Sequence, residues 1–573
     1  MTFLVHHARA RAAAACTVAL LCLWQWDAVG DAGALNHSAV GVALFAALAL
    51  ALFRALGRAD RRRNAISYGL GLLLAVFLVA GRRLSVSGGF TAATFGDWLG
   101  VLAALGGYGA ALGGMLTLLY GWMARPRPTR GRDLLGRFPA VFGLLAVCWI
   151  PAWLALWPGT LRYDAPTQLY TYLDWQLTAH HPLLHTLLLG WCMDVGMSYG
   201  GAGHGLALYC GLQLALMALM LAWACRWMAR HGAPFGARLG VVILFALLPL
   251  YPLFGISATK DVLFGGLFML TVLQIYDLAR EPSALQSPWR ILGFGLTGVL
   301  MCLMRNNGVY ALALAAPFVA LVTVRGRRLR ALFLCWVTAG ASLLANAGLM
   351  AALDAQPGDA VETLSIPLQQ MARVSAMDGL SEEEAALVGE IYPVDPGLAY
   401  DPQIADPVKW AMTYDAFYAD PARYLALWLR MGLEHPARYL EAFLVQNLPY
   451  FYPGAPMRYN VVLGVESTEM YPLASQPLLP GLTALYQRYD ETLEAYGLSG
   501  TYLLSDPAAQ VWLCLATLGF ALWRRRRGLA AVCALLLALW VTCLLGPVAI
   551  LRYMLGFFYA MPVLAAVSLA PDS

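Results

Sequence analysis

Long apolar runs constrain this sequence more than any other feature. An apolar run of about 18 residues or more can cross the ~30 Å hydrocarbon core of a bilayer as a helix. Lipid offers no partner for exposed backbone N–H and C=O groups, so such segments have to be helical. The chain is 60% hydrophobic and 12% charged, against about 25% charged residues in soluble domains. We therefore predict an all-α polytopic membrane protein.

Hydropathy predicts about fourteen transmembrane helices. They are 12–29, 38–57, 65–82, 98–124, 138–157, 205–229, 239–257, 262–280, 291–304, 308–324, 331–353, 507–523, 529–551 and 553–570. No polar A-x-A site follows the first run, which ends at Trp24, Trp26 and Asp27, so we interpret it as an uncleaved helix. The apolar stretch 183–198 does not fit as a span and is interpreted as an interfacial or re-entrant helix.

Arginine-rich loops predict the orientation. The clusters lie at 61–63, 125–137, 226–238, 325–330 and 524–527. The positive-inside rule assigns such loops to the cytoplasm, and the alternation of the predicted spans puts all five on one side. The pair Arg82 and Arg83 is the exception. Both termini are therefore expected in the cytoplasm.

The stretch 354–506 is the one large region without a predicted span. It holds 7 basic and 21 acidic residues, a net charge of −14, whereas the whole chain is +5. Such an acidic exterior argues against nucleic acid as a partner. Acidic residues that only solubilise an exposed domain explain the charge better than a ligand site does. Repeated Asp-Pro and His-Pro starts at Asp420 and His435 predict two successive short helices.

These features divide the chain into four parts. The first is an N-terminal four-helix extension, 1–137; the second is a transmembrane core, 138–353, whose first exterior loop is 158–204; the third is a mostly helical exterior domain, 354–506; and the fourth is a set of C-terminal spans, 507–573. All eleven cysteines lie in or beside apolar segments, so neither a disulfide framework nor a cysteine-based metal site is expected.

Polar residues at the predicted outer helix ends are the candidate site. They are Tyr163-Asp164, His180-His181, Lys260-Asp261, Arg305-Asn306-Asn307 and Arg552-Tyr553. Ionisable groups beside membrane spans are expensive and usually functional. Asp164 is either a general base or the N-cap of a loop helix, since Asp164-Ala-Pro166 is also a helix-start pattern.

The histidines and the cations also leave alternatives open. His180-His181 could hydrogen-bond a sugar or phosphate, cap a helix, or bind metal; metal is the weakest, because adjacent histidines seldom share an ion. Lys260, Arg305 and Arg552 are either interfacial anchors or three cations that converge on one anionic group, as a phosphate buried at a bilayer surface requires. We expect no metal and no cofactor.

Together these residues resemble the GT-C superfamily of membrane glycosyltransferases. The resemblance is closer to a bacterial membrane family of unassigned function related to GT-C proteins and covers roughly 138–570. The segments that carry it are Pro158-Gly-Thr-Leu-Arg-Tyr-Asp164 with Gln168, His180-His-Pro-Leu-Leu-His-Thr186, Lys260-Asp261, Arg305-Asn-Asn-Gly308, Ser365-Ile-Pro-Leu-Gln-Gln-Met-Ala-Arg373, Tyr452-Pro-Gly454 and Gly546-Pro547 with Arg552-Tyr553.

The resemblance implies an inverting transfer of a sugar from an undecaprenyl-phosphate donor, on the exterior face of a bacterial inner membrane, to an envelope glycan, lipid or protein. Asp164 would be the base, with His180 and His181 beside it. The donor phosphate would bind Lys260, Arg305, Arg552, Asn306, Asn307 and Tyr553. The sugar or acceptor would contact Tyr163, Gln168, Asp261, Gln369, Gln370 and Arg373.

The sequence departs from better-known GT-C proteins in two respects. No Asp-x-Asp pair stands at Asp164, because the next aspartate is Asp174, and this favours a metal-independent mechanism. The first four spans have no counterpart in the minimal core. A transporter or flippase of lipid-linked saccharides is the main alternative, although no internal repeat of the transporter kind is visible. A structural or sensory membrane protein is the third possibility.

Overall fold

The computed structural model describes residues 7–26, 38–90, 94–128, 133–458, 461–494 and 503–571. Within these ranges the chain is helical, with isolated β-bridges in place of strands. It forms two compact units, each made of separate stretches of the chain. The first, unit 1, comprises 1–123, 360–457 and 544–549, and the second, unit 2, comprises 124–359, 458–543 and 550–573.

Nine helices of the described chain are long and apolar enough to cross a membrane. Each of the fourteen predicted spans contains a helix, but several of these helices are short, among them 235–247, 288–304 and 307–322. The all-helical membrane fold is thus supported at this coarser level, and the count of fourteen stays a prediction. Residues 27–29, at the predicted end of the first span, lie outside the described residues.

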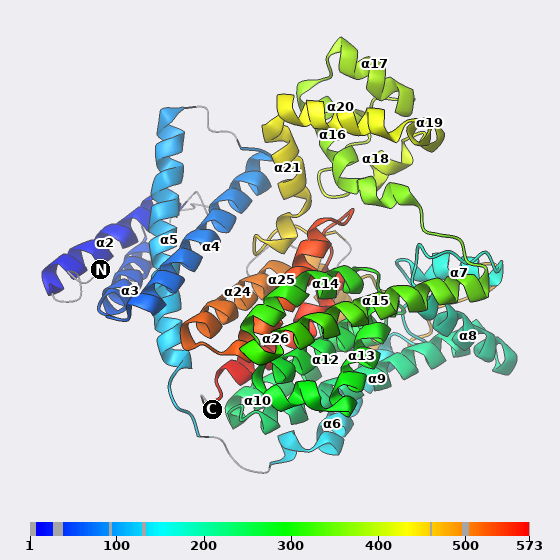
Figure 1. The fold of residues 1–573 in the computed structure, drawn as a ribbon, viewed down its shortest axis with the longest axis horizontal. Coiled ribbons are helices and arrows are strands. Elements are labelled where there is room, and N and C mark those ends of the chain that lie inside the picture. The colour runs from blue at the N-terminus through cyan, green and yellow to red at the C-terminus, as the bar shows by residue number, and fades with distance from the viewer. Residues whose placement is uncertain are drawn as a thin grey trace. The chain divides into compact units, whose positions relative to one another are not determined.

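Unit 1 begins with four long helices. They are α2 (Ala8–Trp24), α3 (Ala39–Leu56), α4 (Arg61–Ser87) and α5 (Phe95–Met123) (Figure 1). Asp60 caps α4 by accepting a hydrogen bond from the backbone N–H of Arg63 at 2.9 Å. Helices α4 and α5 pack through glycines: a Cβ on Gly71 would lie 2.4 Å from the backbone nitrogen of Gly113. Small residues at such a contact are typical of helix pairs in membranes.

The rest of unit 1 is a cluster of shorter helices. They are α16 (Ser365–Asp378), α17 (Glu382–Ile391), α18 (Asp406–Trp410), α19 (Tyr414–Ala419), α20 (Pro421–Glu434) and α21 (Pro436–Gln446), with 3₁₀ turns at 360–364, 396–398 and 448–450. They enclose their own apolar core, which includes Met371, Val388 and Met431. The two short helices predicted from Asp420 and His435 are confirmed as α20 and α21.

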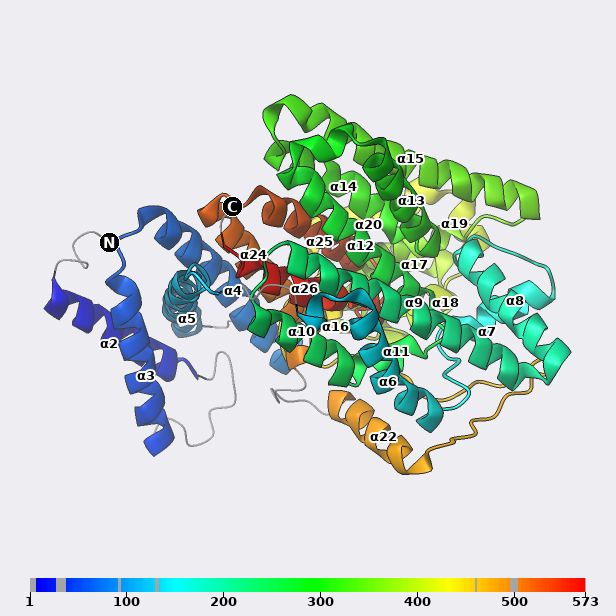
Figure 2. The same cartoon turned by 90° about the horizontal axis from the view of Figure 1, so that it is seen from below.

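Unit 2 holds the remaining helices. They are α6 (Phe138–Ala155), α7 (Ala165–Leu173), α8 (Leu183–Tyr199), α9 (Ala202–Arg230), α10 (Phe235–Leu247), α11 (Leu250–Gly255), α12 (Lys260–Arg280), α13 (Pro288–Met304), α14 (Asn307–Val322), α15 (Arg328–Leu353), α22 (Pro480–Glu494), α24 (Pro507–Arg524), α25 (Arg527–Leu544) and α26 (Leu555–Ser568), with 3₁₀ turns at 134–136, 282–286, 325–327 and 551–554. Helix α22 lies against α6 (Figure 2).

The middle of unit 2 is formed by α12 and α26, which are mostly buried and pack on each other (Figure 1). Helix α15 instead exposes large apolar side chains such as Phe333 and Leu344, as a lipid-facing helix would. The predicted span 239–257 is two helices because Pro249 disfavours a helical conformation at Leu248, where α10 ends, and α11 starts at Leu250. The predicted span 529–551 is too long, because α25 ends at Leu544, just before Gly546-Pro547.

The segment predicted as interfacial or re-entrant, 183–198, is helix α8. It runs beside α9 and is joined to it by Gly200 and Gly201, both with positive φ. The two helices touch at glycines, since a Cβ on Gly196 would lie 2.0 Å from the nitrogen of Gly205. Whether α8 crosses the bilayer stays a prediction.

Candidate functional site: a charged cluster at one end of unit 2

Five charged side chains from four segments of unit 2 form one connected cluster. Asp164 stands at the start of α7, Lys260 and Asp261 begin α12, Arg305 follows the end of α13, and Arg552 lies in the 3₁₀ turn before α26. The start of α12, the end of α13 and the start of α26 therefore lie at the same end of the central bundle. The structure therefore brings these five candidate residues from separate parts of the sequence together.

Arg552 binds the carboxylates of both Asp164 and Asp261. Its Nη1 and Nη2 donate to the two oxygens of Asp164 at 3.0 and 3.1 Å, which is the bidentate arrangement that favours arginine over lysine. Its Nη1 also donates to Asp261 at 3.0 Å. Asp261 accepts further bonds from Arg305 and from the hydroxyl of Thr259. The guanidinium of Arg305 lies 3.9 Å above the ring centre of Tyr553, a cation–π contact.

Lys260 lies at the more open side of the cluster. Its Nζ is 2.8 Å from Asp164 Oδ2 and 3.0 Å from Nδ1 of His181. The ring of His181 is packed edge to face against that of His180, which is exposed. Lys260 thus pairs with Asp164, which is distant in the sequence.

The burial of these side chains decreases from Asp261 toward Asp164. Asp261 is 0% exposed, Arg552 6%, Arg305 8%, Lys260 12% and Asp164 26%. Asp261 therefore serves as the internal counter-charge of two arginines, whereas the carboxylate of Asp164 is open to a ligand. The formal charge of the cluster, with three cations and two carboxylates, is +1.

The local charges set the protonation of Asp164 and His181. Burial alone would raise the pKa of Asp164, but the nearby Arg552 and Lys260 outweigh it and hold the pKa well below its usual value. Burial, followed by the charge of Lys260, lowers the pKa of His181 to about 3. His181 is therefore neutral at pH 7, and its Nδ1 accepts a hydrogen bond from Lys260.

The backbone around Asp164 is fixed on both sides. Thr160 pairs with the strand-like segment at Ser257, and Leu161 pairs with Val465. Tyr163 adopts a left-handed backbone conformation with φ 60°, which is uncommon for a residue other than glycine and tends to occur at functional sites. Its hydroxyl accepts a hydrogen bond from the backbone of Val462 at 2.8 Å. Its ring lies 4.6 Å from the guanidinium of Arg552.

The helix start predicted at Asp164 is present, because Asp164 occupies the N-cap position of α7, but its side chain does not cap the helix. Its carboxylate is bound to Arg552 and Lys260 instead. Helix α7 begins because Pro166 presets the helical φ in its first turn.

Other predicted site residues have different surroundings. The side chains of Asn306 and Asn307 follow Arg305 directly and make no hydrogen bond with the described part of the chain. Gln369, Gln370 and Arg373 lie on α16 in unit 1, where they bind the carbonyl of Asp401, the carbonyl of Tyr439 and the carboxylate of Glu441, respectively. Their assignment to an acceptor stays a prediction.

A buried polar network that the sequence analysis missed supports the cluster. Gln213 donates to the carbonyls of Phe254, Gly255 and Ser257, which lead directly to α12. His185 links Tyr209, at 2.7 Å, to Gln168, at 3.1 Å, and Tyr209 binds Gln213. Polar side chains inside apolar helices are the signal that could have located this network. Gln168, predicted to contact substrate, is fully buried in it.

A cavity of about 770 Å³ opens at the opposite end of α12. It is lined mainly by charged and aromatic side chains, among them Trp223, Trp227, Arg230, His231, Asp277, Arg280, Glu281 and Arg290. Here His231 pairs with Asp277 at 2.8 Å, and Arg290 pairs with Glu281 at 2.6 Å. Both carboxylates have a local partner and lie at the other end of α12, so we do not assign this cavity to the chemistry of Asp164.

Comparison with known proteins identifies the family but not its activity. The model of a family described as "Family of unknown function (DUF6020)" matches residues 166–570. The chain belongs to DUF6020. The match includes Lys260, Arg305 and Arg552, and Asp164 lies just before its first residue. No curated protein and no solved structure matches the chain.

The DUF6020 match agrees with the expected resemblance to a family of unassigned function. The family match starts at residue 166, later than the expected start near residue 138, and it ends at residue 570 as expected. The comparisons give no support for kinship with the GT-C glycosyltransferases. That relationship therefore belongs to the proposal below.

Proposed function

We propose that this DUF6020 protein is a GT-C-like glycosyltransferase. It would move a sugar from an undecaprenyl-phosphate donor to an acceptor in the cell envelope, with Asp164 as the general base. The observation that carries the proposal is a carboxylate, 26% exposed, inside a largely buried cluster of three cations. Because ionisable groups beside membrane spans are costly, such a cluster is a functional site by default.

The charge of the cluster fits an anionic donor. Its formal charge is +1, and within the guanidinium of Arg305 only Nη1 donates a hydrogen bond to a described residue. The remaining N–H groups of Arg305 and the amides of Asn306 and Asn307 are then available to phosphate oxygens. Arginine suits this role because its planar fork matches phosphate geometry. Cations that hold the phosphate would stabilise it as a leaving group.

The transfer would be a single displacement at the anomeric carbon. Asp164 takes the proton of the acceptor hydroxyl, and the acceptor oxygen forms a bond to the anomeric carbon of the sugar. The bond between that carbon and the phosphate oxygen breaks, and its electron pair stays with the polyprenyl phosphate. Attack opposite the leaving group inverts the anomeric configuration. The proposed mechanism is metal-independent.

The depressed pKa of Asp164 makes donor binding part of the mechanism. A carboxylate held by Arg552 and Lys260 is a weak base. When the donor phosphate shares these cations, its negative charge opposes their effect on Asp164 and raises the pKa of that carboxyl. The base would therefore be strongest when the donor is bound, which limits unproductive proton transfer in the empty site.

The topology completes the proposal. In the proposed topology the chain has fourteen spans in the bacterial inner membrane, both termini are cytoplasmic, and residues 354–506 are exterior. Asp164 would then lie on the extracytoplasmic face. Polyprenyl-phosphate sugar and an envelope glycan, lipid or protein would meet there. Gln369, Gln370 and Arg373 are kept as candidate acceptor contacts.

The test is sugar transfer by the full-length protein in nanodiscs, where no ion gradient exists. Asp164→Asn is nearly isosteric and should lower turnover about 10²–10⁴-fold, the usual contribution of general acid–base catalysis. Asp174→Asn, an exposed neighbour on the same loop, is the matched control and should keep full activity. Absence of transfer from any polyprenyl-phosphate donor would favour a lipid-linked saccharide transporter. Transfer that survives in Asp164→Asn would move the base elsewhere.

A further inference from the structure

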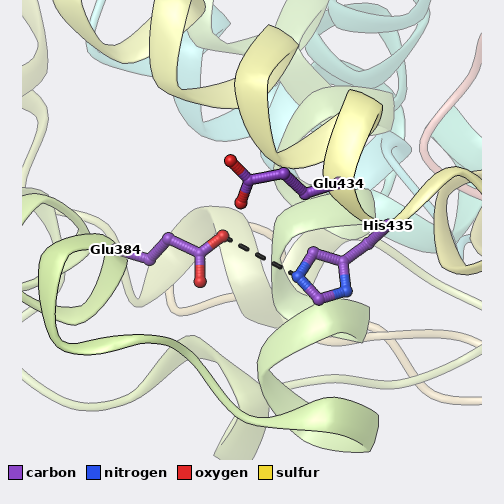
Figure 3. A group of neighbouring side chains, drawn as sticks. All are labelled: Glu384, Glu434 and His435. Carbon is purple, nitrogen blue, oxygen red and sulfur yellow. Dashed lines mark ion pairs between the residues drawn. The ribbon is translucent and has the colours of Figure 1, made fainter.

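A second group of ligand-type side chains lies in unit 1, among the short helices that follow α15. Glu384 comes from α17, and Glu434 and His435 stand at the junction of α20 and α21 (Figure 3). One ligand atom from each residue lies within 4.8 Å of the other two. We propose that these three residues form a binding site for one divalent transition-metal ion, zinc by preference. The site shares no residue with the Asp164 cluster.

The buried carboxylate of Glu384 is the first observation in favour of an ion. Its side chain is 3% exposed. Oε2 accepts hydrogen bonds from the backbone N–H and the hydroxyl of Ser381, both at 2.8 Å, and so completes the capping box of α17. Oε1 is buried and has no hydrogen-bond partner among the described residues. An unsatisfied buried carboxylate oxygen is costly, and a cation would satisfy it.

The orientation of His435 is the second observation. Its Nδ1 lies 3.3 Å from Oδ2 of Asp378, whose other oxygen binds Arg438 at 2.8 Å. A carboxylate on Nδ1 places the proton there and leaves the lone pair of Nε2 available. This is the arrangement by which proteins orient metal-binding histidines. Nε2 faces Oε1 of Glu384 at 3.9 Å (Figure 3), which is too long for a hydrogen bond.

The geometry and the ligand types favour zinc. Zn–N and Zn–O bonds of about 2.0–2.2 Å at tetrahedral angles separate the ligand atoms by roughly 3.4 Å. The ligand atoms lie farther apart than this, 3.9 Å between His435 and Glu384 and within 4.8 Å for the group as a whole, so the side chains would move toward the ion on binding. An imidazole nitrogen among the ligands disfavours Ca²⁺ and Mg²⁺, which take oxygen ligands. Two carboxylates neutralise the ion, and water would fill the fourth position.

Such an ion would join α17 to the α20–α21 junction. Glu384 is about fifty residues before His435 in the sequence, so binding closes a long loop of the chain. Glu434 is exposed, which leaves a path for the ion from solvent. The alternative is that His435 is protonated and pairs directly with Asp378 and Glu384. The two arrangements differ in whether the purified protein takes up zinc.

The experiment measures zinc on the full-length protein, purified with a tag that contains no histidine. After treatment with a chelator and dialysis against micromolar zinc, the wild type should retain about one zinc per chain by elemental analysis. Glu384→Gln keeps the oxygen that accepts the capping hydrogen bonds but loses the charged ligand. This variant and His435→Gln should each bind zinc at least tenfold more weakly. X-ray absorption should show one imidazole nitrogen and carboxylate oxygens around the ion.

Glu383→Gln is the matched control, because Glu383 is the adjacent, exposed carboxylate and pairs with Arg430. It should bind zinc as the wild type does. Zinc should also raise the melting temperature of the wild type and of Glu383→Gln, but not of Glu384→Gln. A wild-type protein that retains no zinc would overturn the proposal. Equal zinc binding by all four proteins would overturn it as well, since the ion would then lie elsewhere.

Discussion

Replacing Lys260 by methionine tests the phosphate-binding role of the cluster with the least damage to the fold. Lys260 is 12% exposed and contacts Asp164 at 2.8 Å, whereas Arg305 and Arg552 are both bound to the fully buried Asp261. Asp164 keeps its two bonds to Arg552 in the variant. Methionine also retains most of the apolar stem of lysine. The change therefore removes one charge from the open side of the cluster and leaves its interior paired.

The expected loss follows from one charge-assisted contact. Such a contact contributes about 1.5–3 kcal/mol, so Lys260→Met should weaken polyprenyl-phosphate binding roughly 10- to 150-fold. Binding is measured by calorimetry with a short-chain polyprenyl phosphate, at fixed ionic strength because salt screens exposed charges. Arg162→Met is the control: Arg162 is 39% exposed, 3.7 Å from Glu466, and outside the cluster. Binding by Lys260→Met within twofold of the wild type, or an equal loss in Arg162→Met, would refute the reasoning.

Three further predictions concern stability, pH and topology. Asp261→Asn removes the buried counter-charge of two arginines and should cost about 3–5 kcal/mol, seen as a lower melting temperature than that of Asp164→Asn; equal melting temperatures would contradict the burial order. His181, whose folded pKa is about 3, binds its proton in the unfolded chain near pH 6.5, so it contributes stability above pH 6.5 that declines as pH falls toward 3. The melting temperature of His181→Gln should consequently change less than that of the wild type between pH 7 and pH 4, and an equal change would exclude this role. Single cysteines at Asp174 and Arg525, in a background without the native cysteines, should label with an impermeant maleimide from outside and inside the cell, respectively; labelling from one side would disprove the predicted topology.

Much of the fold could be predicted because its signals are local. Apolar runs, arginine clusters and capping residues such as Asp420 each act within a few residues, and the helices they predict are present. The lengths of the helices could not be predicted as well, because a helix can end before the apolar run that contains it. Gly546-Pro547 lies directly after α25 and still belongs to an apolar stretch.

The composition of the charged cluster was also predictable, but the partners within it were not. An ionisable side chain beside a membrane span has a high free-energy cost. This criterion identifies Asp164, Lys260, Arg305 and Arg552 from the sequence without knowledge of their contacts. The central position of Asp261 depends on the packing of α12 against the turn before α26. No local pattern encodes such a contact between residues almost three hundred positions apart.

Two features of unit 1 had no sequence signal at all. Arg373 binds Glu441 and the backbone carbonyl of Gly88, so these contacts join three distant parts of the chain. The group Glu384, Glu434 and His435 has no recognisable ligand spacing, because only two of its residues are neighbours. Both arrangements are created by the packing of short helices, which sequence periodicity does not determine.

The most direct test of the central claim is a structure of the full-length protein with a polyprenyl phosphate bound. The account predicts phosphate oxygens within about 2.7–3.2 Å of side-chain nitrogens of Lys260, Arg305 and Arg552, with the carboxylate of Asp164 facing the position of the attached sugar. A phosphate bound elsewhere, with Arg552 still paired to Asp164 and Asp261, would contradict it.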